Sequence, residues 1–184
     1  VDKTPLVGMK VEIGGVQTLT QADGSFLIDL GTMPLAADTI KVRGELFSDA
    51  ARPNVSYPFI AEKLPLMLEH EVYSGYKNVI VRPIYLPKLD LTNAKTISPT
   101  QATVVTTAAL PGTALSVAAG TLLNQQGTPF TGKLSITEVP PELTPAAIPD
   151  GLFPDLLVTI QPGEMVFTTP TPLSLPNREG RAPG

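Results

Sequence analysis

The chain contains a single histidine, His70, which lies between Glu69 and Glu71. A Ser-His-Asp triad would have to use this residue, yet no G-x-S-x-G nucleophile motif accompanies it. A metal site with one histidine needs further carboxylates beyond Glu69 and Glu71, and the sequence does not group them there. We therefore interpret His70 as a solvated edge residue and predict that the chain is not an enzyme.

Two pairs of carboxylates in the second half of the chain could perform general acid–base chemistry, which requires two such groups facing one substrate. They are Asp150 with Asp155, and Glu138 with Glu142. Both pairs lie in or beside proline-rich loops, where acidic residues are usually solvated. We interpret them as turn residues.

Four aspartates of the first half follow or precede predicted turns, where carboxylate oxygens can bind calcium. They lack the D-x-D-x-D-G spacing of a calcium loop, so they define a candidate calcium site only if folding gathers them at one end of a module. No other cofactor is expected. The candidate calcium ligands are Asp23, Asp29, Asp38 and Asp49.

Three tyrosines, Tyr57, Tyr73 and Tyr76, lie in an irregular, proline-containing part of the first half. Exposed aromatic rings in such loops can stack on sugars or on partner side chains, so these residues are candidate ligand-binding residues. The alternative is that they fill the ends of a β-sandwich.

Composition and motifs exclude several function classes. The net charge is −4 and basic residues do not cluster, so nucleic acid is not an expected partner. No apolar run reaches the roughly 20 residues of a membrane span. Neither G-x-x-x-x-G-K nor G-x-G-x-x-G occurs, which argues against nucleotide binding. Cysteine is absent, as it often is from bacterial surface proteins, whereas small extracellular animal domains are more often disulfide-bonded, so a bacterial origin is favoured.

The pattern of residues predicts an all-β protein of many short strands. The 20 prolines and 15 glycines are scattered and oppose long helices, while 42% of the residues are apolar. Apolar and polar residues alternate, and Gly14-Gly15 and Asp23-Gly24 supply turn chemistry. In the first half, strands are expected at 7–13, 16–20, 25–30, 39–46, around 57–61, and at 77–86, the last buried on both faces.

A polar stretch between Pro87 and Pro99 predicts a boundary between two modules of about 90 residues each. Charge is sparse beyond it and short alternating segments resume. A helical turn is expected at 144–147. The strands expected in the second half are 101–106, 113–117, 133–139, 156–160, 165–167 and 172–175.

The first module, residues 1–88, resembles the carboxypeptidase regulatory-like, or transthyretin-like, β-sandwich. The resemblance rests on the segment from Pro5 to Val11, which matches "P-L-x-G-x-x-V", and on Thr20 to Phe26, which matches "T-D-A-D-G-x-F" with Gln21 in place of the first aspartate. It implies an accessory β-sandwich of secreted and surface proteins that carries no peptidase activity.

The second module, residues 89–184, resembles the ZU-type domain of ankyrins, netrin receptors and large bacterial surface proteins. Leu115 to Leu122 is similar to that family's "L-x-I-P-x-G-A-L", with Ala118 in place of proline, and 134–137 and 166–176 are similar to its later strands. The resemblance implies a β-sandwich that is incomplete at its C-terminal end, because further strands of the family would follow.

Together these features predict two tandem β-sandwich modules, transthyretin-like or immunoglobulin-like. The expected role is a non-enzymatic stalk or adhesion-type scaffold of a larger extracellular or cell-surface protein, with neighbouring domains of the same polypeptide as partners. One alternative is a unit that recognises a carbohydrate or protein through 47–76 and 125–130. Another is a regulatory appendage of an extracellular hydrolase.

Overall fold

A computed structural model describes residues 3–31, 38–68, 72–145, 148, 151–152, 154–178 and 180. Over these residues the chain is all-β, with its strands in antiparallel sheets. Helical structure in the same ranges is confined to α1 (Leu64–Met67) and to two 3-10 turns, η1 (Gly44–Leu46) and η2 (Pro141–Leu143). None of these helical segments has the length and apolar character that a membrane span requires.

The chain divides into two compact units. The first unit consists of Val1–Lys88 and Glu142–Phe153, and the second of Leu89–Pro141 and Pro154–Gly184. Residues 142–153 thus join the first unit from a distant part of the sequence.

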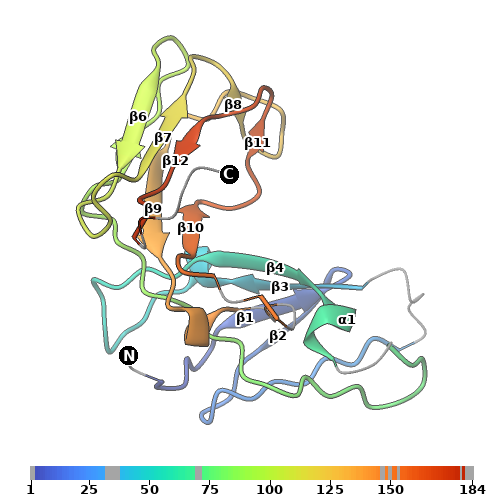
Figure 1. Ribbon diagram of the computed structural model, residues 1–184. Coiled ribbons are helices and arrows are strands. Elements are labelled where there is room, and N and C mark those ends of the chain that lie inside the picture. Colours follow the sequence, from blue (N-terminus) through green and yellow to red (C-terminus); the bar gives the residue numbers. More distant parts are fainter. Residues whose placement is uncertain are drawn as a thin grey trace. The chain divides into compact units, whose positions relative to one another are not determined.

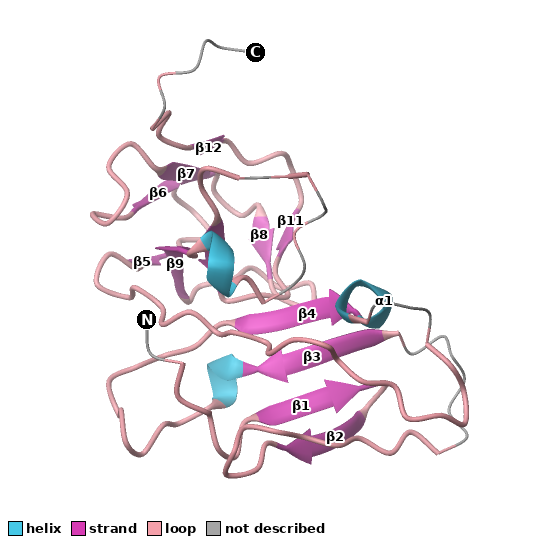
Figure 2. Ribbon diagram, turned by 60° about the horizontal axis from the view of Figure 1, so that its bottom comes forward, coloured by secondary structure: helices cyan, strands magenta, loops and turns pink. Residues whose placement is uncertain are grey.

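The first unit is built on one four-stranded antiparallel sheet with the order β2-β1-β3-β4 (Figure 2). The strands are β1 (Lys10–Ile13), β2 (Val16–Leu19), β3 (Thr39–Arg43) and β4 (Phe59–Lys63). Gly14 and Gly15 form the two-residue turn between β1 and β2, as the sequence predicted, and both have positive φ. The predicted strand around 57–61 is β4, at one edge of the sheet.

One face of this sheet carries the apolar core of the first unit. Val11 pairs in register with Val42, and Ile13 with Ile40, so alternate residues of β1 and β3 point to the same side. All four are buried. Leu64 and Met67 of α1, a helical turn that periodicity did not predict, pack on the same core.

Two predicted strands of the first unit are not strands in the structure. Residues 25–30 and 77–86 pair with no sheet among the described residues. The side chains of 25–30 still alternate, with Phe26, Ile28 and Leu30 packed against the core. The prediction that 77–86 is buried on both faces was wrong, because Val79 and Val81 are each 52% exposed while Ile80 contacts the core.

The second unit is built from shorter strands in three groups. One sheet has the order β12-β7-β6, another β10-β9-β5, and β11 pairs with β8. Figure 1 shows β6, β7 and β12 lying side by side. The strands are β5 (Lys95–Thr96), β6 (Thr103–Thr106), β7 (Ala114–Val117), β8 (Leu122–Leu123), β9 (Lys133–Glu138), β10 (Val158–Gln161), β11 (Val166–Phe167) and β12 (Leu173–Ser174).

All three groups contribute to a single core in the second unit. Partly buried apolar side chains from β10 and β11 pack against its edge. The fully buried residues are Ile97, Val105, Leu115, Val117, Leu122, Leu134 and Ile136.

Most strands of the second unit were predicted, including β6, β7, β9, β10, β11 and β12, although β5 and β8 were not. The prediction of a helical turn at 144–147 was wrong for the two of these residues that the structure describes. Thr144 and Pro145 are not helical, and η2 ends at Leu143. Residues 146 and 147 lie outside the described ranges.

Candidate functional site

Two of the four candidate calcium ligands stabilise local turns. Asp23 Oδ1 accepts a hydrogen bond from the Ser25 amide at 2.9 Å, and Asp29 Oδ1 accepts one from the Gly31 amide at 2.9 Å. Hydrogen bonding from the side chain of Ser25, and then from its amide, lowers the pKa of Asp23. Both carboxylates therefore act as side-chain caps of their own turns.

Asp38 forms an ion pair at the start of β3. Its Oδ1 accepts hydrogen bonds from Lys63 Nζ at 2.6 Å and from Thr39 Oγ1 at 3.1 Å. The Lys63 ammonium lowers the pKa of Asp38. Because Thr39 and Lys63 are paired in register, this ion pair fastens the ends of β3 and β4 together.

Asp49 lies at the centre of a buried polar cluster. Its carboxylate accepts hydrogen bonds from Arg52 Nε at 2.6 Å, from the Ala51 amide at 3.0 Å and from Tyr57 Oη at 3.2 Å. Burial raises the pKa of Asp49, but these hydrogen bonds outweigh it, and the pKa lies below the ordinary value. The cluster holds the loop before β4.

The structure does not gather the four aspartates into a calcium site. Across the described residues, no three side chains of Asp, Glu or His are grouped in a way that could hold a metal ion. Each aspartate is instead engaged by donors close to it.

Three of the other acidic candidates, Glu138, Glu142 and Asp155, lie among the described residues. Glu138 accepts both arms of the Arg178 guanidinium, at 2.7 and 3.1 Å, and the pKa of Arg178 is raised by this contact. Glu142 and Asp155 are exposed. The predicted partner Asp150 and the histidine, His70, lie outside the described residues.

The three candidate tyrosines divide into one buried residue and two exposed ones. Tyr57 is only 2% exposed, and its ring contacts Phe47 with centroids 5.9 Å apart. Because its hydroxyl donates to Asp49, Tyr57 belongs to the core, and its assignment as a ligand-binding residue was wrong.

Tyr73 and Tyr76 lie on an exposed loop whose shape is fixed by Asn78. Asn78 Oδ1 accepts from the Tyr73 amide at 2.9 Å, while Nδ2 donates to the carbonyls of Tyr73 at 2.9 Å and Tyr76 at 3.2 Å. Tyr76 is 79% exposed. We call residues 73–78 the aromatic loop. It presents two rings on a backbone that a single side chain braces.

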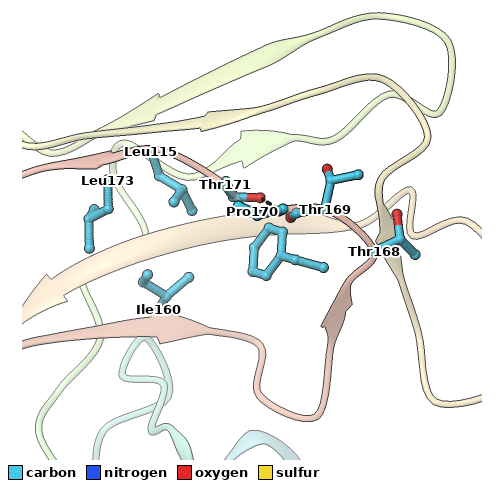
Figure 3. Close-up of a pocket in the computed structure, with 8 residues that line it drawn as sticks. Leu115, Ile160, Thr168, Thr169, Pro170, Thr171 and Leu173 are labelled. Carbon is cyan, nitrogen blue, oxygen red and sulfur yellow. Dashed lines mark hydrogen bonds between the residues drawn. The ribbon is translucent and has the colours of Figure 1, made fainter.

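A shallow open groove of about 480 Å³ lies in the second unit. Figure 3 shows Leu115 and Leu173 on one side of it and Ile160 on the other. None of the described residues that line it is charged, and these residues offer apolar contact and hydroxyl groups. The lining residues are Leu115, Ile160, Phe167, Thr168, Thr169, Pro170, Thr171 and Leu173.

Sequence reasoning did not find this groove. It predicted the strands that carry Leu115, Ile160 and Leu173, but a groove depends on which strands lie at the edges of their sheets. The available signal was the run from Thr168 to Pro172, because prolines are confined to sheet edges and turns.

Comparison with protein-family models, with curated proteins and with solved structures finds no match.

Proposed function

We propose that this chain is a non-enzymatic interaction module, of the stalk or adhesion type, within a larger secreted or cell-surface protein. The observation that carries the proposal is the aromatic loop. Tyr73 and Tyr76 are exposed on a backbone braced by Asn78. Large aromatic side chains held in place lose little conformational entropy on binding and commonly dominate contact with proteins and sugars.

The chemistry-bearing side chains support the same proposal. Asp23, Asp38 and Asp49 are each engaged by neighbouring donors that stabilise a turn, a strand pair or a loop. These contacts give the carboxylates a structural role.

The proposal includes membership of residues 1–88 in the carboxypeptidase regulatory-like class of β-sandwich. The two segments that carry this resemblance lie against each other. A Cβ placed on Gly24 would be 3.1 Å from the Cβ of Pro5, and the Thr20 hydroxyl donates to the Leu6 carbonyl. The Gly8 amide also donates to the Thr20 carbonyl at 2.9 Å. The two segments are therefore parts of one hydrogen-bonded local structure.

For residues 89–184 we propose a ZU-type-like β-sandwich. In the segment that carries that resemblance, Leu115, Val117 and Leu122 share one core, and Gly120 has the positive φ that its turn requires. The proposed setting is extracellular and bacterial, with neighbouring domains, a carbohydrate or a protein as partners.

Binding of the chain to an array of glycans and extracellular-matrix proteins tests the proposed function. We expect at least one ligand whose affinity falls tenfold or more in Tyr76→Ala and Tyr73→Ala. The melting temperature should stay unchanged because both side chains are exposed. Leu27→Ala is the matched control, since Leu27 is a similarly exposed apolar residue outside the loop.

Asn78→Ala tests whether binding needs the braced backbone of the aromatic loop or only its two tyrosine rings. This change keeps both tyrosines but removes the three hydrogen bonds that fix the loop, so affinity should fall through loss of preorganisation. Binding that is unaffected by all three loop substitutions would overturn the proposal.

A further inference from the structure

The second unit is closed along one side and hollowed along the other. β5 contacts β6, and β6 contacts β9, so the two three-stranded sheets meet on that side. β10 and β12 are the outer strands at the opposite ends of these sheets. The groove lies between these two strands, with Ile160 from β10 and Leu173 from β12 in its lining (Figure 3).

The main chain of β10 is available for hydrogen bonding on its outer side. In an antiparallel pair, successive residues alternate between bonding to the partner strand and pointing their main-chain groups away from it. The Val139 amide donates to the Leu157 carbonyl at 2.9 Å, so Val158 and Ile160 point their amide and carbonyl groups away from β9. No described residue hydrogen-bonds to these outward groups.

β12 has the same arrangement over a shorter length. The Ser116 amide of β7 donates to the Pro172 carbonyl at 3.0 Å, so Leu173, the next residue, points its main-chain groups away from β7. These groups too have no hydrogen-bond partner among the residues that the structure describes.

The side chains beside these edges are apolar and incompletely covered. Val158, Ile160 and Phe167 pack against the core but remain partly exposed, and Leu173 is 40% exposed. Because the groove lining is uncharged, a charged side chain entering it would lose hydration without gaining a partner. An occupant must therefore be uncharged where it faces the groove.

We propose that the outer edge of β10 binds one extended segment of another polypeptide by β-strand addition. The segment carries uncharged aliphatic side chains at alternate positions. Its main chain pairs with Val158 and Ile160, and every second side chain enters the groove between β10 and β12. β10 is the pairing edge because it is four residues long, whereas β12 has two.

A separate segment fits this site better than a second copy of the chain. A strand that already lies in the sheet of a second copy could pair with β10, but its own neighbours would keep its side chains out of a groove between two layers. An isolated strand can pair with β10 and also place its side chains in the groove. This inference does not rest on the aromatic loop, which belongs to the first unit.

Amide hydrogen exchange of the chain with a capped synthetic peptide of alternating valine and threonine tests the inference. We expect exchange at Val158 and Ile160 to slow by tenfold or more at saturating peptide. A peptide with aspartate in place of each valine should have no effect. The Tyr76→Ala variant should bind the valine peptide normally, which distinguishes this site from the proposed aromatic-loop function.

Leu173→Lys places a charge in the groove and should weaken peptide binding tenfold or more. Leu175→Lys is the control, because Leu175 is similarly exposed but does not line the groove. Equal melting temperatures show that both variants fold. Unchanged exchange at β10, or equal effects of the two peptides, would overturn the inference. Slower exchange at Val158 and Ile160 as the concentration of the chain alone is raised would also overturn it, because the occupant would then be a second copy of the chain.

Discussion

The two units cover their cores in different ways. In the first unit, one sheet supplies the buried residues of β1 and β3, while α1 and the extended stretches 26–30 and 80–84 cover them without joining a sheet. In the second unit, strands of three sheets face one another across the core. The first core is therefore enclosed partly by extended backbone that joins none of the described sheets, and the second mainly by paired strands.

This difference shows what an alternating sequence encodes and what it does not. Alternation determines which side chains of an extended segment turn inward, because successive side chains point to opposite faces. It does not provide a neighbouring strand for the main chain. Residues 26, 28 and 30 are directed to the core in the first unit, although no strand of the described sheet pairs with them.

The largest expected effects come from truncating one buried side chain in each core. Ile40 is 0% exposed in the centre of the first sheet, and Ile136 is 1% exposed on β9. Replacing either with alanine should cost about 3–4 kcal/mol, because the lost methyl groups leave a cavity. In calorimetry, Ile40→Ala should lower one unfolding transition and Ile136→Ala the other. A single transition that both variants lower equally would show instead that the two units unfold as one.

Much of the fold could be predicted where periodicity and turn chemistry agree. Residues 7–20 combine alternation with Gly14-Gly15, and 133–139 alternates between polar turns. Within them, 10–13, 16–19 and 133–138 are paired strands. The stretch 77–86 misled because a continuous apolar run resembles a doubly buried strand. Pairing depends on residues distant in sequence, which a local pattern does not contain.

The candidate site was harder to predict for the same reason. Tyr57, Tyr73 and Tyr76 are the same residue type in one irregular region, yet Tyr57 is buried and donates to the Asp49 carboxylate, whereas Tyr73 and Tyr76 are exposed. Nothing in the residues next to it signals this contact. The groove likewise depends on β10 and β12 being outer strands, which is a property of sheet order and not of either segment.

An intermediate effect is expected in the extended stretch that covers the first core. Ile80 packs on that core, whereas its neighbour Val79 is 52% exposed. Ile80→Ala should reduce the free energy of unfolding by about 1–2 kcal/mol, since a half-buried side chain loses part of its transfer energy. Val79→Ala should change it by less than about 0.5 kcal/mol. Equal losses of unfolding free energy in urea denaturation would contradict the arrangement in which Ile80 faces the core and Val79 faces solvent.

The smallest expected effects distinguish two buried hydroxyls of β9. Thr137 Oγ1 accepts a hydrogen bond from the Asp90 amide at 2.8 Å, whereas Ser135 Oγ has no hydrogen-bond partner among the described residues. Thr137→Ala leaves that amide unsatisfied and should cost about 1 kcal/mol, while Thr137→Ser should restore part of it. Ser135→Ala removes no hydrogen bond and should be neutral within about 0.5 kcal/mol, or stabilising. Denaturant unfolding measures all three variants, and a loss in Ser135→Ala as large as that in Thr137→Ala would mean that the Ser135 hydroxyl is hydrogen-bonded in solution. The expected order follows from the partner of each hydroxyl, since both residues are buried on the same strand.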